Sequence, residues 1–157
     1  SGSADPATAR AAFVDAMNEW AAALGLQNTR FANPSGDDDA NSYSSARDVS
    51  IMAAELLNVP ELAGMVEMAS YEFTSPGGNV YTAISTNAML GEGGVIGVKT
   101  GSTGEAGGCV VLARADADGG TTIVTILGSD LAYNELNQIV SDARWDDARS
   151  LFQTIDS

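Results

Sequence analysis

The chain of 157 residues contains no histidine and only one cysteine, Cys109. Without histidine it cannot carry a Ser-His-Asp or Cys-His catalytic unit, nor a zinc site with imidazole ligands. A single cysteine cannot form a disulfide within the chain. Because Val110, Val111 and Leu112 follow it, we interpret Cys109 as a small buried apolar residue of a strand.

Basic residues are also scarce, since 7 Lys and Arg stand against 21 Asp and Glu and give a formal net charge of −14. Nucleic acids and anionic membranes bind proteins through Lys and Arg that neutralise phosphates, so neither is an expected partner. No apolar run approaches the roughly 20 residues that a membrane-spanning helix requires. A hydrophobic content of 45% nevertheless supports one packed core, and we expect a single domain over residues 1–157.

The chain changes in pattern near residue 70, from helical spacing to short strands. Asp5 before Pro6 predicts a helix start, and Ser45 with Asp48 three residues later is typical of a capping box. Turns rich in Gly and Asp separate the later apolar runs, which predicts antiparallel neighbours. We therefore expect an α+β fold with a helical part over 5–70 and an antiparallel sheet with a packing helix over 71–157. The predicted helices cover 6–24, 45–58, 60–68 and 131–155, and the predicted strands cover 71–74, 80–84, 95–100, 108–115 and 121–128.

The only lysine of the chain, Lys99, lies in the stretch Gly97-Val98-Lys99-Thr100-Gly101-Ser102-Thr103. A short β-branched run bounded by glycines precedes it and predicts a buried strand that ends at Lys-Thr-Gly. A lysine at this place can act simply as a charge that protects a sheet edge from aggregation. Its neighbours, however, are a hydroxyl and two glycines, so the stretch is also a candidate binding strand.

This stretch, followed by Ala106-Gly107-Gly108-Cys109, resembles the active-site hairpin of the low-molecular-mass penicillin-binding proteins, the serine-type D-alanyl-D-alanine carboxypeptidases. The similarity extends over nearly the whole chain. It includes the loop Asn33-Pro34-Ser35-Gly36, the helix entry Tyr43-Ser44-Ser45-Ala46-Arg47-Asp48, and Thr86-Asn87.

The resemblance implies a β-lactamase-like or D,D-peptidase-like fold and a hydrolase that removes the terminal D-Ala of peptidoglycan stem peptides, outside the cytoplasmic membrane of a bacterium. Peptidoglycan stem peptides and β-lactams would be its ligands, and neither a metal nor another cofactor is implied. Lys99 and Thr100 would bind the terminal carboxylate of a peptide that lies along the strand. Gly101 would let the backbone approach that peptide, and the Ser102 N–H would be one of two oxyanion donors.

The chain departs from this family in one respect, because it contains no Ser-x-x-Lys motif. In the family the serine of that motif is the nucleophile, and its helix, with the first strands of the sheet, would precede residue 1. We therefore expect the chain by itself to be inactive. Ser1-Gly2-Ser3 can be interpreted as a remnant of the family's Ser-Gly-Asn turn or as a cloning scar.

A rival hypothesis is a non-catalytic half-domain that binds peptidoglycan or assembles with another chain. A sheet that lacks strands exposes an apolar edge, so this hypothesis predicts self-association or a complementing chain. A fragment of a class A β-lactamase shares Lys-Thr-Gly but not the 31–36 loop, and we rank it last.

The acidic loop raises one further alternative. Asp37, Asp39, Asn41 and Asp48 fall at positions one, three, five and twelve of a calcium-binding loop of the EF-hand type. Ser42 stands where that loop requires glycine, and a helix start at about Ser45 would interrupt the loop. We therefore prefer a solvated loop without a metal.

Overall fold

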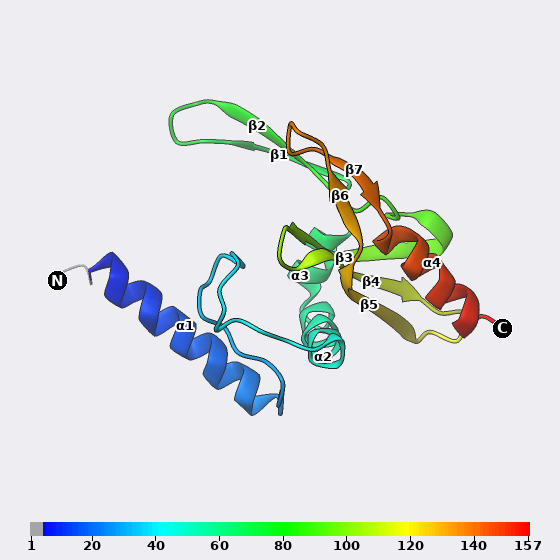
Figure 1. Ribbon diagram of the computed structural model, residues 1–157, viewed down its shortest axis with the longest axis horizontal. Coiled ribbons are helices and arrows are strands. Elements are labelled where there is room, and N and C mark those ends of the chain that lie inside the picture. The colour runs from blue at the N-terminus through cyan, green and yellow to red at the C-terminus, as the bar shows by residue number, and fades with distance from the viewer. Residues whose placement is uncertain (1–4) are drawn as a thin grey trace.

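The computed structural model describes residues 5–157, so the interpretation of Ser1-Gly2-Ser3 lies outside the described residues. Helices occupy the first part of the chain, antiparallel sheets follow, and one helix closes it (Figure 1). The α+β class predicted from the sequence is confirmed. The helices are α1 (Pro6–Ala23), α2 (Ala46–Leu57), α3 (Pro60–Val66), the 3-10 helix η1 (Glu92–Gly94) and α4 (Arg144–Ile155).

Two of the helix starts follow the predicted capping residues. The Asp5 carboxylate accepts a hydrogen bond from the Thr8 N–H at 3.3 Å, and Pro6 is the first residue of α1. The Ser45 hydroxyl accepts from the Asp48 N–H at 3.1 Å at the start of α2. These bonds satisfy N–H groups that have no partner within a helix, which is why the helices begin there.

Helix α1 stands apart from the sheets in Figure 1. Asn18 attaches it to the following loop, because its Nδ2 donates to the Phe31 carbonyl at 2.8 Å and its Oδ1 accepts from the Phe31 N–H at 2.9 Å. The apolar side of this helix is only partly covered, because Ala21 is buried but its larger side chains are not. Phe13 is 58% exposed and Trp20 is 48% exposed, since residues 5–157 place no element over them.

The strands form separate antiparallel sheets, with β1 paired to β2, β3–β4–β5 in that order, and β6 paired to β7. In the central sheet Lys99 lies opposite Val111 and Thr100 lies opposite Val110. Side chains alternate along a strand, so Lys99 and Thr100 lie on opposite faces of this sheet. The strands are β1 (Ser70–Thr74), β2 (Val80–Ile84), β3 (Val95–Thr103), β4 (Gly107–Ala115), β5 (Thr121–Ser129), β6 (Leu131–Tyr133) and β7 (Ile139–Asp142).

The core lies between the central sheet and α4. Val110 and Leu112 of β4 pack with Ala148 and Phe152 of α4, and all four side chains are buried. Burying such side chains contributes about 25 cal/mol for each Å² of apolar surface removed from water. This packing holds β4, and through it β3, in place.

Helix α2 lies on the opposite face of the sheet. The Ser50 hydroxyl is 2.7 Å from the Thr125 hydroxyl of β5, a residue that pairs with Val111. Helix α3 follows α2 after a bend of 112°. Within the described part of the chain no helix is by itself long and apolar enough to cross a membrane, although α2 and α3 taken together as one bent pair meet that test.

The prediction of one long helix over 131–155 is wrong in its first half. Residues 131–142 form the β6–β7 hairpin, and helix α4 begins only at Arg144. The turn explains this outcome, because Asn134 Oδ1 accepts from the N–H groups of Leu136 and Gln138, each at 3.0 Å, and Asn137 has φ of 57°. Asparagine tolerates this left-handed conformation and caps turns with its side chain, so the local chemistry favours a hairpin.

Candidate functional site

Strand β3 forms one side of the central sheet. It pairs with β4 along one edge, and no strand among residues 5–157 pairs with its other edge. The backbone groups along that edge are therefore available to an extended peptide. The four residues selected from the sequence, Lys99, Thr100, Gly101 and Ser102, lie consecutively on this strand.

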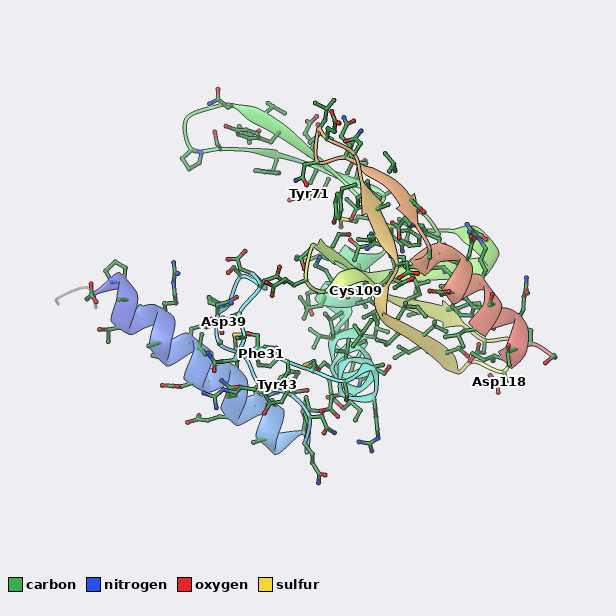
Figure 2. All side chains as sticks on the ribbon, in the orientation of Figure 1. Phe31, Asp39, Tyr43, Tyr71, Cys109 and Asp118 are labelled. Carbon is green, nitrogen blue, oxygen red and sulfur yellow. The ribbon has the colours of Figure 1, made fainter. Side chains whose placement is uncertain are left out.

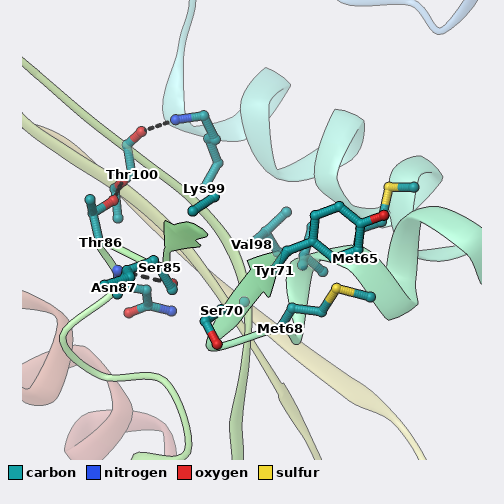
Figure 3. A pocket seen from close by; sticks show the side chains of 14 residues that line it. Met65, Met68, Ser70, Tyr71, Ser85, Thr86, Asn87, Val98, Lys99 and Thr100 are labelled. Atoms are coloured by element: carbon teal, nitrogen blue, oxygen red, sulfur yellow. Dashed lines mark hydrogen bonds between the residues drawn. The ribbon is translucent and has the colours of Figure 1, made fainter. Parts of the chain in front are cut away.

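Lys99 is exposed, and its ammonium group donates a hydrogen bond to the carbonyl of Thr100. The Thr100 hydroxyl is 2.5 Å from the Thr86 hydroxyl (Figure 3). Thr86 belongs to the segment between β2 and η1, so this bond connects that segment to β3. A cation and a hydroxyl are thus carried by successive residues of β3.

An apolar groove of about 610 Å³ runs beside this edge. Its lining comes from α3, the base of the β1–β2 hairpin, the segment 85–87 and β3. Met65 of α3 and Tyr71 of β1 both line the groove, and Figure 3 shows them across from Lys99. One polar group at the groove is unsatisfied, since Asn87 Nδ2 is buried without a hydrogen-bond partner among the described residues.

Gly97 allows α3 to lie directly against β3. A Cβ atom at this position would be 2.9 Å from Val66 Cγ2 and 3.0 Å from the Val66 carbonyl oxygen. The first distance is shorter than real Cβ contacts, and the second is tighter than nine in ten of them. The glycine before Val98-Lys99 therefore sets the width of the groove at its α3 side.

Arg144, the first residue of α4, holds the C-terminal end of β3. It is only 2% exposed. Its Nη1 donates to the Gly101 carbonyl at 2.6 Å and to the Cys109 carbonyl at 3.0 Å, and its Nη2 donates to the Ser102 hydroxyl at 2.6 Å. Nε donates to Asp142 Oδ1 at 2.7 Å, so the buried charge is also paired.

Glycines of β4 make room for this arginine. A Cβ at Gly108 would lie 3.3 Å from Arg144 Nε and 3.3 Å from the side chain of Leu131. Gly107 has φ of 67°, and a Cβ there would be 2.7 Å from the Ser129 carbonyl oxygen. The Ala106-Gly107-Gly108 stretch is thus explained by close packing at the end of the hairpin. The adjacent Cys109 is half-buried rather than buried, and its thiol donates to the Ala106 carbonyl at 3.4 Å.

The acidic loop contacts the same end of β3. The Thr103 hydroxyl donates to Asp38 Oδ1 at 2.8 Å. The neighbouring carboxylates form hydrogen bonds within their own loop. Asp37 accepts from the Ser35 hydroxyl at 2.6 Å, and Asp39 accepts from the Asn41 N–H at 2.8 Å. Figure 2 shows Asp39 on this loop near α1. Among residues 5–157 the acidic side chains form no cluster suited to a metal ion.

Asp48, interpreted from the sequence as a capping residue on the helix surface, is completely buried instead. Its Oδ2 accepts from the Asn28 N–H at 2.8 Å and from the Thr29 hydroxyl at 2.9 Å, which joins α2 to the loop after α1. Burial alone raises the pKa of the Asp48 carboxyl, but the hydrogen bonds from Asn28, Thr29 and Ser45 outweigh it and hold the pKa below its usual value. Asp48, which would be the twelfth residue of a calcium-binding loop, therefore binds Asn28 and Thr29 instead.

With this geometry described, comparison with known proteins identifies the class. Residues 5–130 match the model of the Peptidase_S11 family, described as D-alanyl-D-alanine carboxypeptidase. The match covers most of the chain, so the chain belongs to this family, as the sequence resemblance predicted.

Individual relatives agree with this assignment. The chain is 42% identical over 102 residues to D-alanyl-D-alanine carboxypeptidase DacF of Bacillus subtilis, covering 62% of this chain and 25% of the relative. It is 35% identical over 135 residues to the D-alanyl-D-alanine carboxypeptidase of Streptomyces sp. strain K15, covering 82% of this chain and 46% of the relative. The chain thus spans between a quarter and a half of the length of these relatives.

Solved structures show the same fold. The crystal structure of the Streptomyces K15 DD-transpeptidase superimposes with a TM-score of 0.75 at 34% identity, over 83% of this chain and 51% of that chain. A penicillin-binding protein homologue from Mycobacterium tuberculosis gives a TM-score of 0.75 at 27% identity, over 92% of this chain and 53% of that chain. The described chain therefore has the fold of part of a D,D-peptidase domain.

Proposed function

We propose that β3 is the substrate-binding strand of a serine-type D-alanyl-D-alanine carboxypeptidase, and that peptidoglycan stem peptides bind along its open edge. One observation carries this proposal. The open edge of β3 presents the only lysine of the chain, exposed and next to a hydroxyl, beside an apolar groove. Membership of the carboxypeptidase family supports it.

In this proposal each residue of the strand has a distinct role. The ammonium group of Lys99 and the hydroxyl of Thr100 bind the terminal carboxylate of the peptide through charge-assisted hydrogen bonds. Gly101 leaves the backbone accessible, and the Ser102 N–H stabilises the oxyanion that forms during acyl transfer. Arg144, bonded to both the Gly101 carbonyl and the Ser102 hydroxyl, keeps these two residues in position.

The nucleophile is not among the 157 residues, because the sequence has no Ser-x-x-Lys. The printed chain by itself is therefore expected to bind but not to hydrolyse D-Ala-D-Ala peptides. A polypeptide that supplies the motif would complete the enzyme and would also bind β-lactams. Its substrate places it outside the bacterial cytoplasmic membrane.

A titration with two matched peptides tests this proposal. The isotope-labelled chain is titrated with an N-acetylated stem peptide that ends in D-Ala-D-Ala and with the same peptide as its C-terminal amide. The free acid should shift the amide resonances of 98–102 and bind at least tenfold more tightly, the ratio expected for loss of a charge-assisted hydrogen bond. Equal binding of acid and amide would exclude Lys99 as a carboxylate ligand.

Two substitutions make the test specific. Lys99→Gln should abolish the preference for the free acid while the fold is retained. Arg47→Gln removes the same charge from α2, where the side chain is 78% exposed, and should leave the preference intact. A loss of preference in both variants would point to net charge rather than to Lys99.

The exposed face of α1 favours a second candidate function, assembly with another chain. Phe13 is 58% exposed and Trp20 is 48% exposed on this one helix, and such apolar surface is typical of an interaction site. Sedimentation of the chain and of a Trp20→Ser variant tests this candidate. A monomer for both would reject self-association, whereas a dimer that the substitution dissociates would support it.

A further inference from the structure

The two faces of the β1–β2 hairpin carry different kinds of side chain. In the register of this hairpin Phe73 lies opposite Tyr81 and Tyr71 lies opposite Ala83. Since paired residues share a face of the sheet, one face carries three aromatic rings and an alanine. The large aliphatic residues Val80 and Ile84 fall on the other face.

The three rings form a continuous strip. The ring centroids of Tyr71 and Phe73 are 6.3 Å apart with planes 16° from parallel, and those of Phe73 and Tyr81 are 5.4 Å apart with planes 21° from parallel. Cross-strand contact of this kind stabilises a hairpin. Stabilisation of the hairpin does not account for the exposure of the rings, which is 57% for Tyr71, 46% for Phe73 and 49% for Tyr81.

The strip begins in the groove beside the binding strand. Tyr71 lines that groove together with Lys99 and Thr100, and Figure 3 shows its ring beside Met65. From there the hairpin extends away from the rest of the molecule, as Figures 1 and 2 show. Ser70 and Ile84 of the other face also line the groove, so a ligand that fills the groove and continues outward has the aromatic face as one of two paths.

The chemistry of the strip favours a neutral ring-shaped ligand. Residues 70–84 contain no Lys or Arg, and Glu72, their only charged residue, lies on the aliphatic face opposite Thr82. This composition excludes a polyanion. The rings stack on one another, and the ring faces that stay exposed are weakly negative, so they attract the polarised C–H groups of a pyranose ring. A purely hydrophobic partner would bind aromatic and aliphatic side chains alike, so the separation of the two kinds onto different faces favours a ligand that stacks on rings.

We propose that this aromatic face binds the amino-sugar glycan to which the stem peptide is attached. The inference rests on the proposed function, because it places the peptide in the groove and the sugars on the hairpin. The glycan then contributes affinity and directs the peptide toward Lys99. Peptidoglycan would be bound as a glycopeptide rather than as a free peptide.

Two probes test the proposal, the free stem pentapeptide and the same pentapeptide carrying its amino-sugar disaccharide. The disaccharide-peptide should bind about tenfold more tightly, as expected for stacking on two rings. Phe73→Leu combined with Tyr81→Leu removes the rings but keeps apolar bulk in the hairpin. This variant should lose the tenfold advantage while its affinity for the free pentapeptide is unchanged.

Val80→Ala on the opposite face is the matched control and should retain the advantage. Equal affinity of the two probes for the unmodified chain would overturn the proposal, as would a loss of the advantage in the control. Self-association through the hairpin without any sugar effect would also overturn it and would indicate a protein partner instead.

Failure of the proposed function gives a different result. If neither peptide probe binds, titration with the neutral tetramer of N-acetylglucosamine still tests the hairpin. Amide shifts confined to residues 71–83 would support the sugar site even though Lys99 binds no carboxylate. The absence of such shifts would reject the sugar site independently.

Discussion

Arg144 Nη1 lies 2.6 Å from the carbonyl oxygen of Gly101, across 43 positions of sequence. Because the same guanidinium also bonds Ser102 and Cys109, it determines how the end of the Lys-Thr-Gly-Ser strand sits on α4. Replacing this side chain by Met removes the donor to the Gly101 and Cys109 carbonyls and the charged partner of Asp142. We expect Arg144→Met to lower the free energy of unfolding by about 3 kcal/mol, as for loss of one partner of a buried ion pair.

Arg149→Met on the same helix is the control for that change. Arg149 is 40% exposed and pairs with Glu92 at 2.8 Å, so its loss should cost less than about 1 kcal/mol. Urea denaturation followed by circular dichroism measures both variants. Equal destabilisation by the two substitutions would contradict the special role of Arg144.

The contact between Gly97 and Val66 leads to a second prediction. An alanine at position 97 would place its Cβ 2.9 Å from Val66 Cγ2, which forces α3 away from β3. We expect Gly97→Ala to destabilise the chain by about 1–3 kcal/mol, in the range of overpacked sites. Gly104→Ala is the matched control, since a Cβ there meets nothing within 4 Å, and thermal denaturation compares the two. A stable Gly97→Ala variant would show that the α3–β3 contact adapts easily.

The central sheet could be predicted from the sequence because its signals are local. β-branched runs between glycines gave strands β3, β4 and β5, and the Ser45 capping motif gave the start of α2. The four residues proposed to bind the substrate lie together on β3, but their proposed roles rest on the family resemblance and not on a local pattern.

Other features depend on contacts that no local pattern reveals. The burial of Arg144 requires a glycine at position 108 on a different strand, and the burial of Asp48 requires the loop at Asn28. In 131–143 the apolar spacing fits a helix, but the Asn134 and Asn137 turn makes a hairpin. These two asparagines are the only local signal of the hairpin in the sequence, and the helix-like spacing of the apolar residues obscures it.

Acid should destabilise the protein through three carboxyl groups. Hydrogen bonding to Arg149 lowers the pKa of Glu92, and hydrogen bonding to Arg114 lowers the pKa of Asp156; the pKa of Asp48 is lowered as well. Each group binds protons less readily when folded, so its stabilisation is present above the unfolded pKa of about 4 and is lost as pH falls through the lower folded pKa.

Urea midpoints should therefore change little between pH 7 and 5 and fall from about pH 4 downward. Arg149→Met removes the partner of Glu92 and should make the fall of the urea midpoint smaller. Because the Arg149–Glu92 pair is exposed, high salt should weaken it and reduce the fall in the same way. A midpoint that rises on acidification would contradict the assignment. The same measurement on the unmodified chain at high salt serves as the reference.

The Asp48 carboxylate provides the last prediction, because it is the link between α2 and the loop that follows α1. Asp48→Ala leaves the Asn28 N–H without its acceptor and the Thr29 hydroxyl with only the Ser44 hydroxyl as partner, and an unsatisfied polar group is costly. Amide hydrogen exchange at Asn28 and in the neighbouring loop should accelerate strongly in this variant. Asp48→Asn retains an acceptor oxygen and should show a smaller effect, and Asp15→Ala on the exposed side of α1 should show none. Unchanged exchange in Asp48→Ala would mean that the loop is held by its other contacts, such as the backbone pair between Arg30 and Tyr43.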